Sequence, residues 1–227
     1  MCGRFALFID LATLIHFFGL TESSQDKLPM RYNIAPTQDV AAIRVIDGQR
    51  QLSLLHWGLI PFWAKDSKIA YNTINARSET ASKVPSYRAA FRSRRCLIPG
   101  NGFFEWDKIS GSKQPYFIDR ADGDPMVFAG LWETWHDKEA NTVIESCTIL
   151  TTEAAEPVAS IHPRMPVILE PEEFDAWLDP NEHQVEHLQA LLQPAAPGVL
   201  ELHPVSRHVN KATNDDPRCI EPVDLEK

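Results

Sequence analysis

The sequence has no apolar run near the ~18 residues that a membrane-spanning helix needs, and no basic segment followed by an apolar one at its N-terminus. It is also poor in cysteine. Its four cysteines are far apart and show no CxxC spacing: Cys2, Cys96, Cys147 and Cys219. This argues against a disulfide framework and a cysteine-based zinc site. We therefore expect a soluble cytoplasmic protein with reduced thiols, no membrane partner, no metal ion and no cofactor.

Internal repeats, low-complexity segments and a clear domain boundary are also missing. The 227 residues are 44% hydrophobic and 23% charged, which is ordinary for a globular chain and argues against disorder. This length suits one large domain or two small ones. We expect a single domain over residues 1–227, with about ten polar residues forming a tail at the C-terminus.

Positive charge is scarce overall, and the net charge of −9 at first argues against a nucleic-acid partner. The distribution of charge argues otherwise. Between Pro61 and Gly100, eight lysines and arginines face two acidic residues, a net charge of +6. A local basic surface on an acidic protein can bind phosphates, although a chance cluster of solvated charges is as good an interpretation of this stretch alone.

Hydrophobic patterning predicts many strands and several short helices. An Asp-Gly turn signal separates the second and third of the predicted strands. We expect strands at 5–9, 40–46, 51–60, 95–106 with a break at 99–102, 116–119, 126–133, 146–151, 167–170 and near 199, and helices at 10–18, 78–91 with a break at Pro85, 153–160, 171–178 and 181–192.

The first residues suggest the chemistry. A small residue at position 2 allows removal of Met1, and Cys2 then carries a free α-amine and a thiol on neighbouring carbons. The amine can attack an aldehyde to give an imine, and the thiol can close on the imine carbon to give a thiazolidine. Reference pKa values of about 7.7–8.0 for the amine and 8.5 for the thiol leave both groups reactive near neutral pH. In an arbitrary protein, however, a cysteine at position 2 is usually accidental.

Three further positions are candidates for acid–base or positioning roles. Asn75 and Arg77 point to the same side of an extended segment, where an amide can hydrogen-bond in both directions and a guanidinium can hold a phosphate. Glu105 is a lone carboxylate among aromatic and apolar neighbours, and burial disfavours its charged form, which suits proton transfer. His162 precedes a proline in a predicted loop, with Arg164 close behind as a phosphate ligand. Each also has an ordinary structural interpretation.

Two tryptophans and one histidine pair need separate interpretations. We assign Trp57 to the core, whereas Trp63, close to Lys65 and Lys68, suits a stacking platform for a nucleic-acid base. The segment 183–187 fits the H-x-x-E-H pattern of a metallopeptidase class. We reject that interpretation, because helical spacing turns both histidines toward solvent.

Taken in order, these motifs resemble the SRAP family of abasic-site processing proteins, also called SOS-response-associated peptidases. The resemblance covers almost the whole chain. Residue 104 is often tyrosine and residue 100 often alanine in that family. The matching segments are Cys2-Gly3-Arg4-Phe5, Tyr32 to Pro36, Trp57 to Pro61, Asn75 to Thr80, Gly102 to Trp106, His162 to Pro166, and Val205 to Asn210.

The resemblance implies a monomer of α+β fold, with a curved, largely antiparallel, barrel-like sheet flanked by helices. It implies a DNA-damage response protein of the nucleoid that senses abasic sites in single-stranded DNA. Cys2 would form a covalent thiazolidine crosslink with the sugar aldehyde, with ring opening as its reverse, besides the lyase and peptidase activities assigned to the family. By position, the implied catalytic residues are Cys2, Asn75, Glu105 and His162, and the implied DNA-binding residues are Arg4, Pro36, Trp63, Arg77 and Arg164.

Two other functions remain open on the sequence. An N-terminal-nucleophile amidohydrolase or peptidase would use the same Cys2 thiol against an amide, with the α-amine as base. The sequence has no Asn-Gly-Asp or Arg-Trp-Ala-Thr-His-Gly-like stretch, both of which the glutamine amidotransferases of that class tend to carry. A non-covalent single-stranded DNA-binding module would use the basic stretch alone and would bind equally well with Cys2 replaced.

Overall fold

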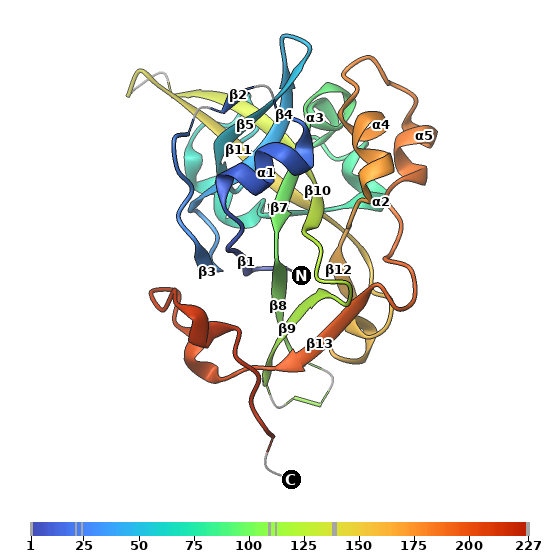
Figure 1. Ribbon diagram of the computed structural model, residues 1–227. Helices are drawn as coiled ribbons and strands as arrows, with labels where there is room; N and C mark the ends of the chain where they lie inside the picture. Colours follow the sequence, from blue (N-terminus) through green and yellow to red (C-terminus); the bar gives the residue numbers. More distant parts are fainter. Residues whose placement is uncertain are drawn as a thin grey trace.

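A ring of five strands forms the upper half of the molecule (Figure 1). The computed structural model describes residues 2–20, 22–23, 25–108, 110–111, 113–137 and 140–225, so the predicted removal of Met1 lies outside the described residues. The ring closes because β11 pairs with β10 on one side and, in parallel, with β5 on the other. Its members in spatial order are β5 (Gln49–Trp57), β4 (Asp39–Ile46), β7 (Arg95–Gly100), β10 (Met126–Asp137) and β11 (Thr142–Glu153).

A second sheet lies below the ring, and β1, one of its strands, lies on the side that faces the ring (Figure 1). The polypeptide passes from one sheet to the other at Asn101, which separates β7 from β8. Gly102 is required just after this point, because a Cβ there would lie 2.4 Å from the carbonyl oxygen of Ile118 on the next strand. The order of this sheet is β13 (Leu200–Pro204), β9 (Pro115–Arg120), β8 (Gly102–Trp106), β1 (Phe5–Leu7) and β3 (Arg31–Ile34).

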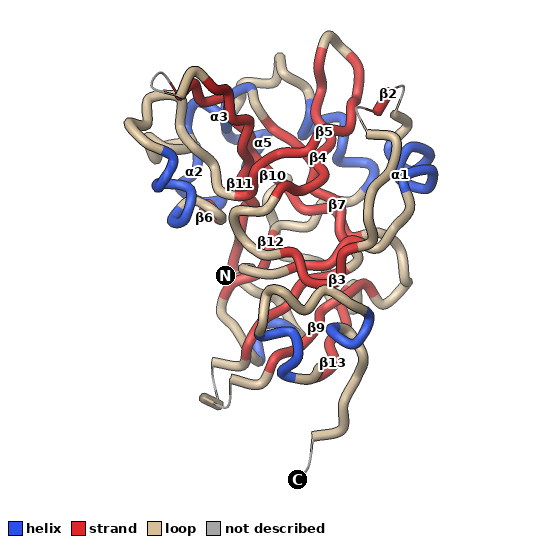
Figure 2. Tube along the Cα trace, turned by 90° about the vertical axis from the view of Figure 1, so that its left-hand side faces the viewer, coloured by secondary structure: helices blue, strands red, loops and turns tan. Residues whose placement is uncertain are grey.

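Three short strands extend the ring. Two of them, β6 and β12, lie beside β11 and carry residues that the sequence analysis selected. Seen from the side, β12 and β6 lie at the level where the ring meets the second sheet (Figure 2). Their bounds are Asn75–Arg77 for β6 and Arg164–Pro166 for β12, and the third, β2 (Glu22–Ser23), pairs with β5.

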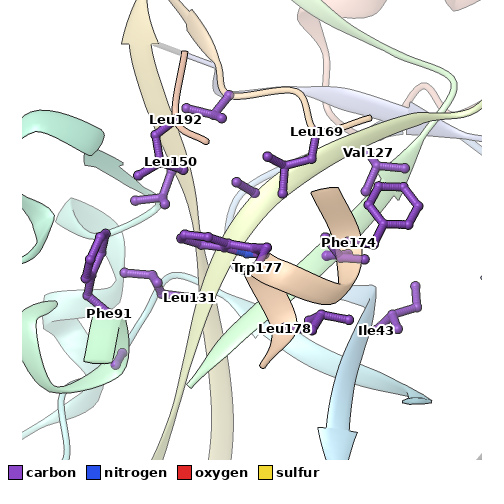
Figure 3. Packing of buried hydrophobic residues seen from close by; sticks show 14 of the residues in the cluster. Ile43, Phe91, Val127, Leu131, Leu150, Leu169, Phe174, Trp177, Leu178 and Leu192 are labelled. Carbon is purple, nitrogen blue, oxygen red and sulfur yellow. The ribbon is translucent and has the colours of Figure 1, made fainter. Parts of the chain in front are cut away.

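Alternate residues of the ring strands pack into two different cores, as the period of two in a strand requires. One core lies against the helices, where Trp177 and Phe174 of α4 meet Leu131, Leu150 and Val127 (Figure 3). The other core contains Cys2 and residues of both sheets. The helices are α1 (Leu11–Phe18), α2 (Ser78–Ala81), α3 (Arg88–Ser93), α4 (Phe174–Leu178) and α5 (Val185–Ala190), with 3₁₀ turns at Ser67–Asn72, Val158–Ser160, Pro171–Glu173, Arg207–Asn210 and Pro217–Cys219.

The predicted α+β class is confirmed, with a mostly antiparallel, barrel-like core in a single domain. The predicted bounds of elements were accurate where capping or turn residues determine them. Asp10 caps α1 by accepting from the amide of Thr13, and Gly19 ends the helix in the left-handed region. Asp47 and Gly48 both have positive φ, as a tight hairpin turn between β4 and β5 needs.

Other predicted elements were wrong. The helix expected at 153–160 is one 3₁₀ turn at Val158–Ser160, because β11 continues to Glu153 and Pro157 interrupts the segment. The strand expected at 167–170 is displaced to β12, with a single bridge at Ile168. The helix expected at 181–192 shortens to α5. Within the described residues, no helix has the length and apolar character to cross a membrane.

Candidate active site around Cys2

Cys2 lies immediately before β1 and is fully buried. Strand β1 is held on both sides, because Phe5 pairs with Ile34 of β3 and with Phe103 of β8. Within the described part of the chain, the thiol makes one long hydrogen bond, in which Sγ donates to the carbonyl oxygen of Arg4 at 3.7 Å. The position of Cys2 is therefore set by its backbone and by the surrounding core.

Asn75 fixes that backbone directly. Its side-chain nitrogen donates to the carbonyl oxygen of Cys2 at 2.7 Å. Asn75 is itself held by the pairing of β6 with Ile149 of β11, and by the Tyr87 hydroxyl, which donates to its carbonyl oxygen at 3.1 Å. Its Oδ1 is buried and has no hydrogen-bond partner among the described residues. The side-chain amide of Asn75 therefore holds Cys2 through its nitrogen, and its oxygen can accept a hydrogen bond from another group.

Glu105 and His162 form a second buried pair, from β8 and from the loop after the Val158 turn. The two side chains are 2% and 4% exposed as residues, and Nδ1 of the imidazole lies 3.8 Å from Oε1 of the carboxylate. The imidazole is oriented by the carbonyl of Arg164, 2.8 Å from Nδ1, and by Lys108, whose Nζ lies 3.4 Å from Nε2. A lysine ammonium can only donate, so this contact favours a proton on Nδ1, whereas the amide of Arg164 donates to Nδ1 at 3.0 Å and favours the other tautomer.

The electrostatics join this pair to Cys2. Burial, and after it the negative charge of Glu105, raises the pKa of the Cys2 thiol to about 12. Burial lowers the pKa of His162, partly offset by the charge of Glu105. Near neutral pH, the site therefore contains a protonated thiol and a neutral imidazole. The amide of Phe104, next to Glu105, donates to the carbonyl oxygen of Arg4 at 2.9 Å, so Cys2, Asn75, Glu105 and His162 lie in one region of the fold although they are far apart in sequence.

The three candidate phosphate-binding arginines have different surroundings. Arg77 is exposed on β6. Arg4 is half-buried and donates from Nη1 to Oδ1 of Asn33 at 2.7 Å and to the carbonyl oxygen of Val209 at 2.9 Å. Arg164 forms an ion pair with Glu79. Of the three, only Arg77 presents its guanidinium to solvent without a hydrogen-bond partner among the described residues.

Trp63 lies well away from the thiol. It is 48% exposed, and its neighbour Ala64 accepts a hydrogen bond from the indole of Trp135. Trp135 is paired with Ile144, five residues along β11 from the partner of Asn75. At ~3.4 Å per residue, Ile144 and Ile149 lie about 17 Å apart along β11, so Trp63 and Asn75 lie beside different parts of this strand. Pro36 is partly buried in the turn before Thr37, whose amide bonds the Trp57 carbonyl.

The basic stretch is only partly a surface, which corrects the sequence-based interpretation. Arg95 is 3% exposed and donates to four or more backbone carbonyls, including those of Trp177 and Phe91, so it stabilises the α4 region. Arg94 is paired with Glu133 at 2.7 Å. The exposed cations of the stretch are Lys65, Lys68, Arg77, Lys83, Arg88 and Arg92.

One group of side chains has the composition of a metal site. His208, Asp216 and Cys219 bring their ligand atoms within 4.8 Å of one another. Each of these atoms already has a protein partner: the Asp216 carboxylate bonds both His208 and Arg218, and the Cys219 thiol donates to the carbonyl of Asn214. The adjacent Arg218 guanidinium also opposes a cation there. This group fits a hydrogen-bonded network that orders the C-terminal segment.

Sequence analysis missed several residues that position the site. Tyr87 supports Asn75, Lys108 contacts His162, and Asn33, which is fully buried, bonds Arg4 and three carbonyls of residues 209–214. Asn33 lies within a motif used for the family resemblance, which is the one signal that could have selected it. The exposed His183 and the 62% exposed side chain of His187 agree with rejection of the metallopeptidase pattern.

Comparisons with known proteins identify the family of this chain. Residues 1–212 match the family model described as SOS response associated peptidase (SRAP). The chain is 41% identical to the abasic site processing protein YoqW of Bacillus subtilis over 97% of this chain and 99% of that protein. It is 34% identical to the abasic site processing protein HMCES of Gallus gallus, over 78% of this chain and 59% of that one.

Solved structures give the same result. A crystal structure of a protein from Bacteroides thetaiotaomicron superposes with a TM-score of 0.89 at 26% identity, covering 98% of this chain and all of that one. One from Bordetella bronchiseptica gives a TM-score of 0.76 at 28% identity, covering 90% of this chain. The chain is therefore a member of the SRAP family.

Proposed function

We propose that the protein recognises abasic sites in single-stranded DNA and joins itself to them through Cys2, as a thiazolidine. The observation that carries the proposal is the set of contacts on residue 2. Its carbonyl is fixed by a buried amide, and its thiol lies within the electrostatic influence of the Glu105 carboxylate. A residue whose only role is to fill space needs neither.

The reaction needs no cofactor. After removal of Met1, the Cys2 α-amine attacks the aldehyde carbon of the ring-opened sugar, and one water leaves to give an imine. The thiol then adds its sulfur to the imine carbon while its proton passes to the nitrogen, which closes the five-membered ring. Because burial raises the thiol pKa, the amine reacts first and the thiol loses its proton within the site.

Protons are moved by the buried pair. Glu105 takes the proton that the attacking amine loses and gives it to the leaving hydroxyl, which departs as water; it then accepts the thiol proton and passes it to the ring nitrogen, and it serves ring opening in reverse. Neutral His162 assists opening of the sugar ring. Asn75 holds the carbonyl of Cys2 with its nitrogen and has Oδ1 left to orient the α-amine or a sugar hydroxyl. These roles follow the family resemblance.

The DNA path follows the exposed edge of β6 and β12. Arg77 and Arg164 would contact the phosphates beside the abasic sugar, and Arg4 would contribute charge from the other side of Cys2. Trp63 would stack on a base farther along the strand, and Pro36 would shape the path. We also propose that the protein acts as a monomer, in the cytoplasm with DNA.

The amidohydrolase or peptidase alternative uses the same thiol. It would require a thiolate, or a thiol activated by the α-amine, to attack an unreactive amide. A raised thiol pKa disfavours that first step, whereas addition to an aldehyde starts at the amine. Turnover of glutamine or peptides by the untagged protein would support the alternative.

A denaturing gel tests the proposal. Untagged protein is mixed with an oligonucleotide carrying one abasic site, beside an undamaged strand and the Cys2→Ala variant. A heat-stable band that needs both the abasic site and Cys2 is expected. Cys2→Ser should give only an imine that borohydride traps. No band from protein with a verified N-terminal Cys2 would sink the crosslinking proposal.

Two further variants test the assigned roles. Glu105→Gln and His162→Ala should slow formation or reversal of the crosslink while non-covalent affinity for the strand stays nearly constant. If both crosslink at the parent rate, the proton-transfer roles are wrong, even if Cys2 forms the adduct.

A further inference from the structure

The guanidinium of Arg164 is already occupied by a carboxylate in the free protein. Its Nη1 and Nη2 donate to the two oxygens of Glu79 at 2.5 and 3.0 Å. Nη2 also bonds the carbonyl oxygen of Thr151 on β11. This side-by-side pairing is the geometry in which a guanidinium binds either a carboxylate or a phosphate, so Glu79 takes the position that a phosphate would use.

Arg164 binds this carboxylate, and the charge of Arg77 also acts on it. Strand β11 lies between them, since Thr151 pairs with Arg77 of β6 and Glu153 pairs with Arg164 of β12. Hydrogen bonding to Arg164 is the main cause that lowers the pKa of Glu79, and the charge of Arg77 adds to it. Glu79 is therefore ionised at any pH at which DNA would bind.

The pair is poised to open. The Glu79 side chain is 50% exposed and lies on the outer side of the four-residue helix α2, whereas that of Arg164 is 18% exposed and is also held by Thr151. Loss of the carboxylate would leave Arg164 in place. A half-exposed ion pair of this kind is weak in water, so an incoming phosphate can compete for it.

We propose that Glu79 is an internal competitor of DNA phosphate at Arg164, so that strand binding exchanges a carboxylate for a phosphate. The inference rests on the proposed function, because the competing anion is a phosphate of the bound strand. Glu79 thereby lowers the affinity for every single strand, damaged or not, since a phosphate contact carries no information about the base.

A double-mutant cycle tests the exchange. The dissociation constant for an undamaged fluorescent single-stranded oligonucleotide is measured by anisotropy at low salt. The proteins are wild type, Glu79→Gln, Arg164→Ala and the double variant. Glu172→Gln, an exposed carboxylate on the Pro171–Glu173 turn, makes the same change in net charge as a matched control. We expect Glu79→Gln to tighten binding about two- to fivefold, the range that the weakness of such pairs sets.

The cycle separates exchange from simple repulsion. If Glu79 acts by occupying Arg164, its removal in the Arg164→Ala background should tighten binding no more than Glu172→Gln does. An equal gain in both backgrounds would mean that Glu79 only repels the strand, and an absence of gain in wild type would also overturn the inference.

The same proteins are tested for crosslinking to an abasic strand. Tighter binding of Glu79→Gln without any wild-type crosslink would reject the proposed function and keep the exchange at Arg164. A normal wild-type crosslink together with unchanged affinity of Glu79→Gln would reject the exchange at Arg164 and keep the proposed function.

Discussion

Removal of the Asn75 side chain should disable the site more than it destabilises the fold. The Asn75→Ala change deletes the hydrogen bond to the carbonyl of Cys2 and leaves that buried oxygen without its donor. Leaving a buried polar group unsatisfied costs about 1–3 kcal/mol. Because Cys2 lies at the beginning of the chain, we expect the cost to be met by local undocking of residues 2–4.

The magnitude follows from the population of the docked state. A penalty of about 1–3 kcal/mol lowers the docked fraction, and with it the crosslinking rate, by roughly five- to 150-fold if docking is a prerequisite for reaction. The assay is the single-turnover rate of adduct formation with an abasic oligonucleotide, beside urea unfolding followed by tryptophan fluorescence. The loss of global unfolding free energy should be smaller than the free energy that corresponds to the loss of crosslinking rate.

Tyr87→Phe is the matched control, because it removes a hydrogen bond to the same residue without touching Cys2. We expect it to lower stability by about 1 kcal/mol and to leave the crosslinking rate within about twofold of wild type. An Asn75→Ala protein that is as stable as Tyr87→Phe and crosslinks at the parent rate would refute the positioning role.

Two predictions concern the fold. Gly102→Ala should lower the free energy of unfolding by at least about 2 kcal/mol, because its Cβ would lie 2.4 Å from a carbonyl oxygen. Gly100→Ala, whose Cβ would have its nearest contacts at 3.1 and 3.2 Å, should lower it by less than about 1 kcal/mol. Equal losses in urea unfolding would contradict this packing. Burial raises the pKa of Cys96 above that of an unfolded thiol. The contribution of the buried, protonated thiol to the free energy of unfolding is therefore complete below about pH 8.5 and is lost as the pH rises above that value. The fall of unfolding free energy between pH 9.5 and 10.5 should therefore be shallower in Cys96→Ala than in wild type by about 1.4 kcal/mol per pH unit, and parallel slopes would show that the native thiol already ionises there.

Local sequence signals predicted the elements that local physics determines. Asp10 and Gly19 bounded α1 because capping depends on residues within a few positions. The break between β7 and β8 was predicted because Pro99, Gly100 and Gly102 mark it. Ring closure by the parallel β5–β11 pairing had no such signal, since it depends on segments about ninety residues apart that meet only in the folded core.

The site divides in the same way. The chemistry of Cys2 could be predicted from its position in the chain and its side chain. The order of motifs, through the family resemblance, predicted Asn75, Glu105 and His162 as site residues. Periodicity could not predict that Glu105 would be completely enclosed, because its burial comes from the His162 loop and from both sheets. It also could not predict that Arg95 would be internal or that Arg164 would bind Glu79 across 85 residues of sequence. Such pairs are set by tertiary packing alone.

The most direct test of the account is the intact mass of the covalent product between untagged protein and an abasic single strand. The account predicts the protein without Met1, plus the strand, minus one water, in a complex that resists borohydride and heat and is absent with Cys2→Ala. An adduct at another residue, or none from protein whose N-terminus is verified as free Cys2, would contradict it.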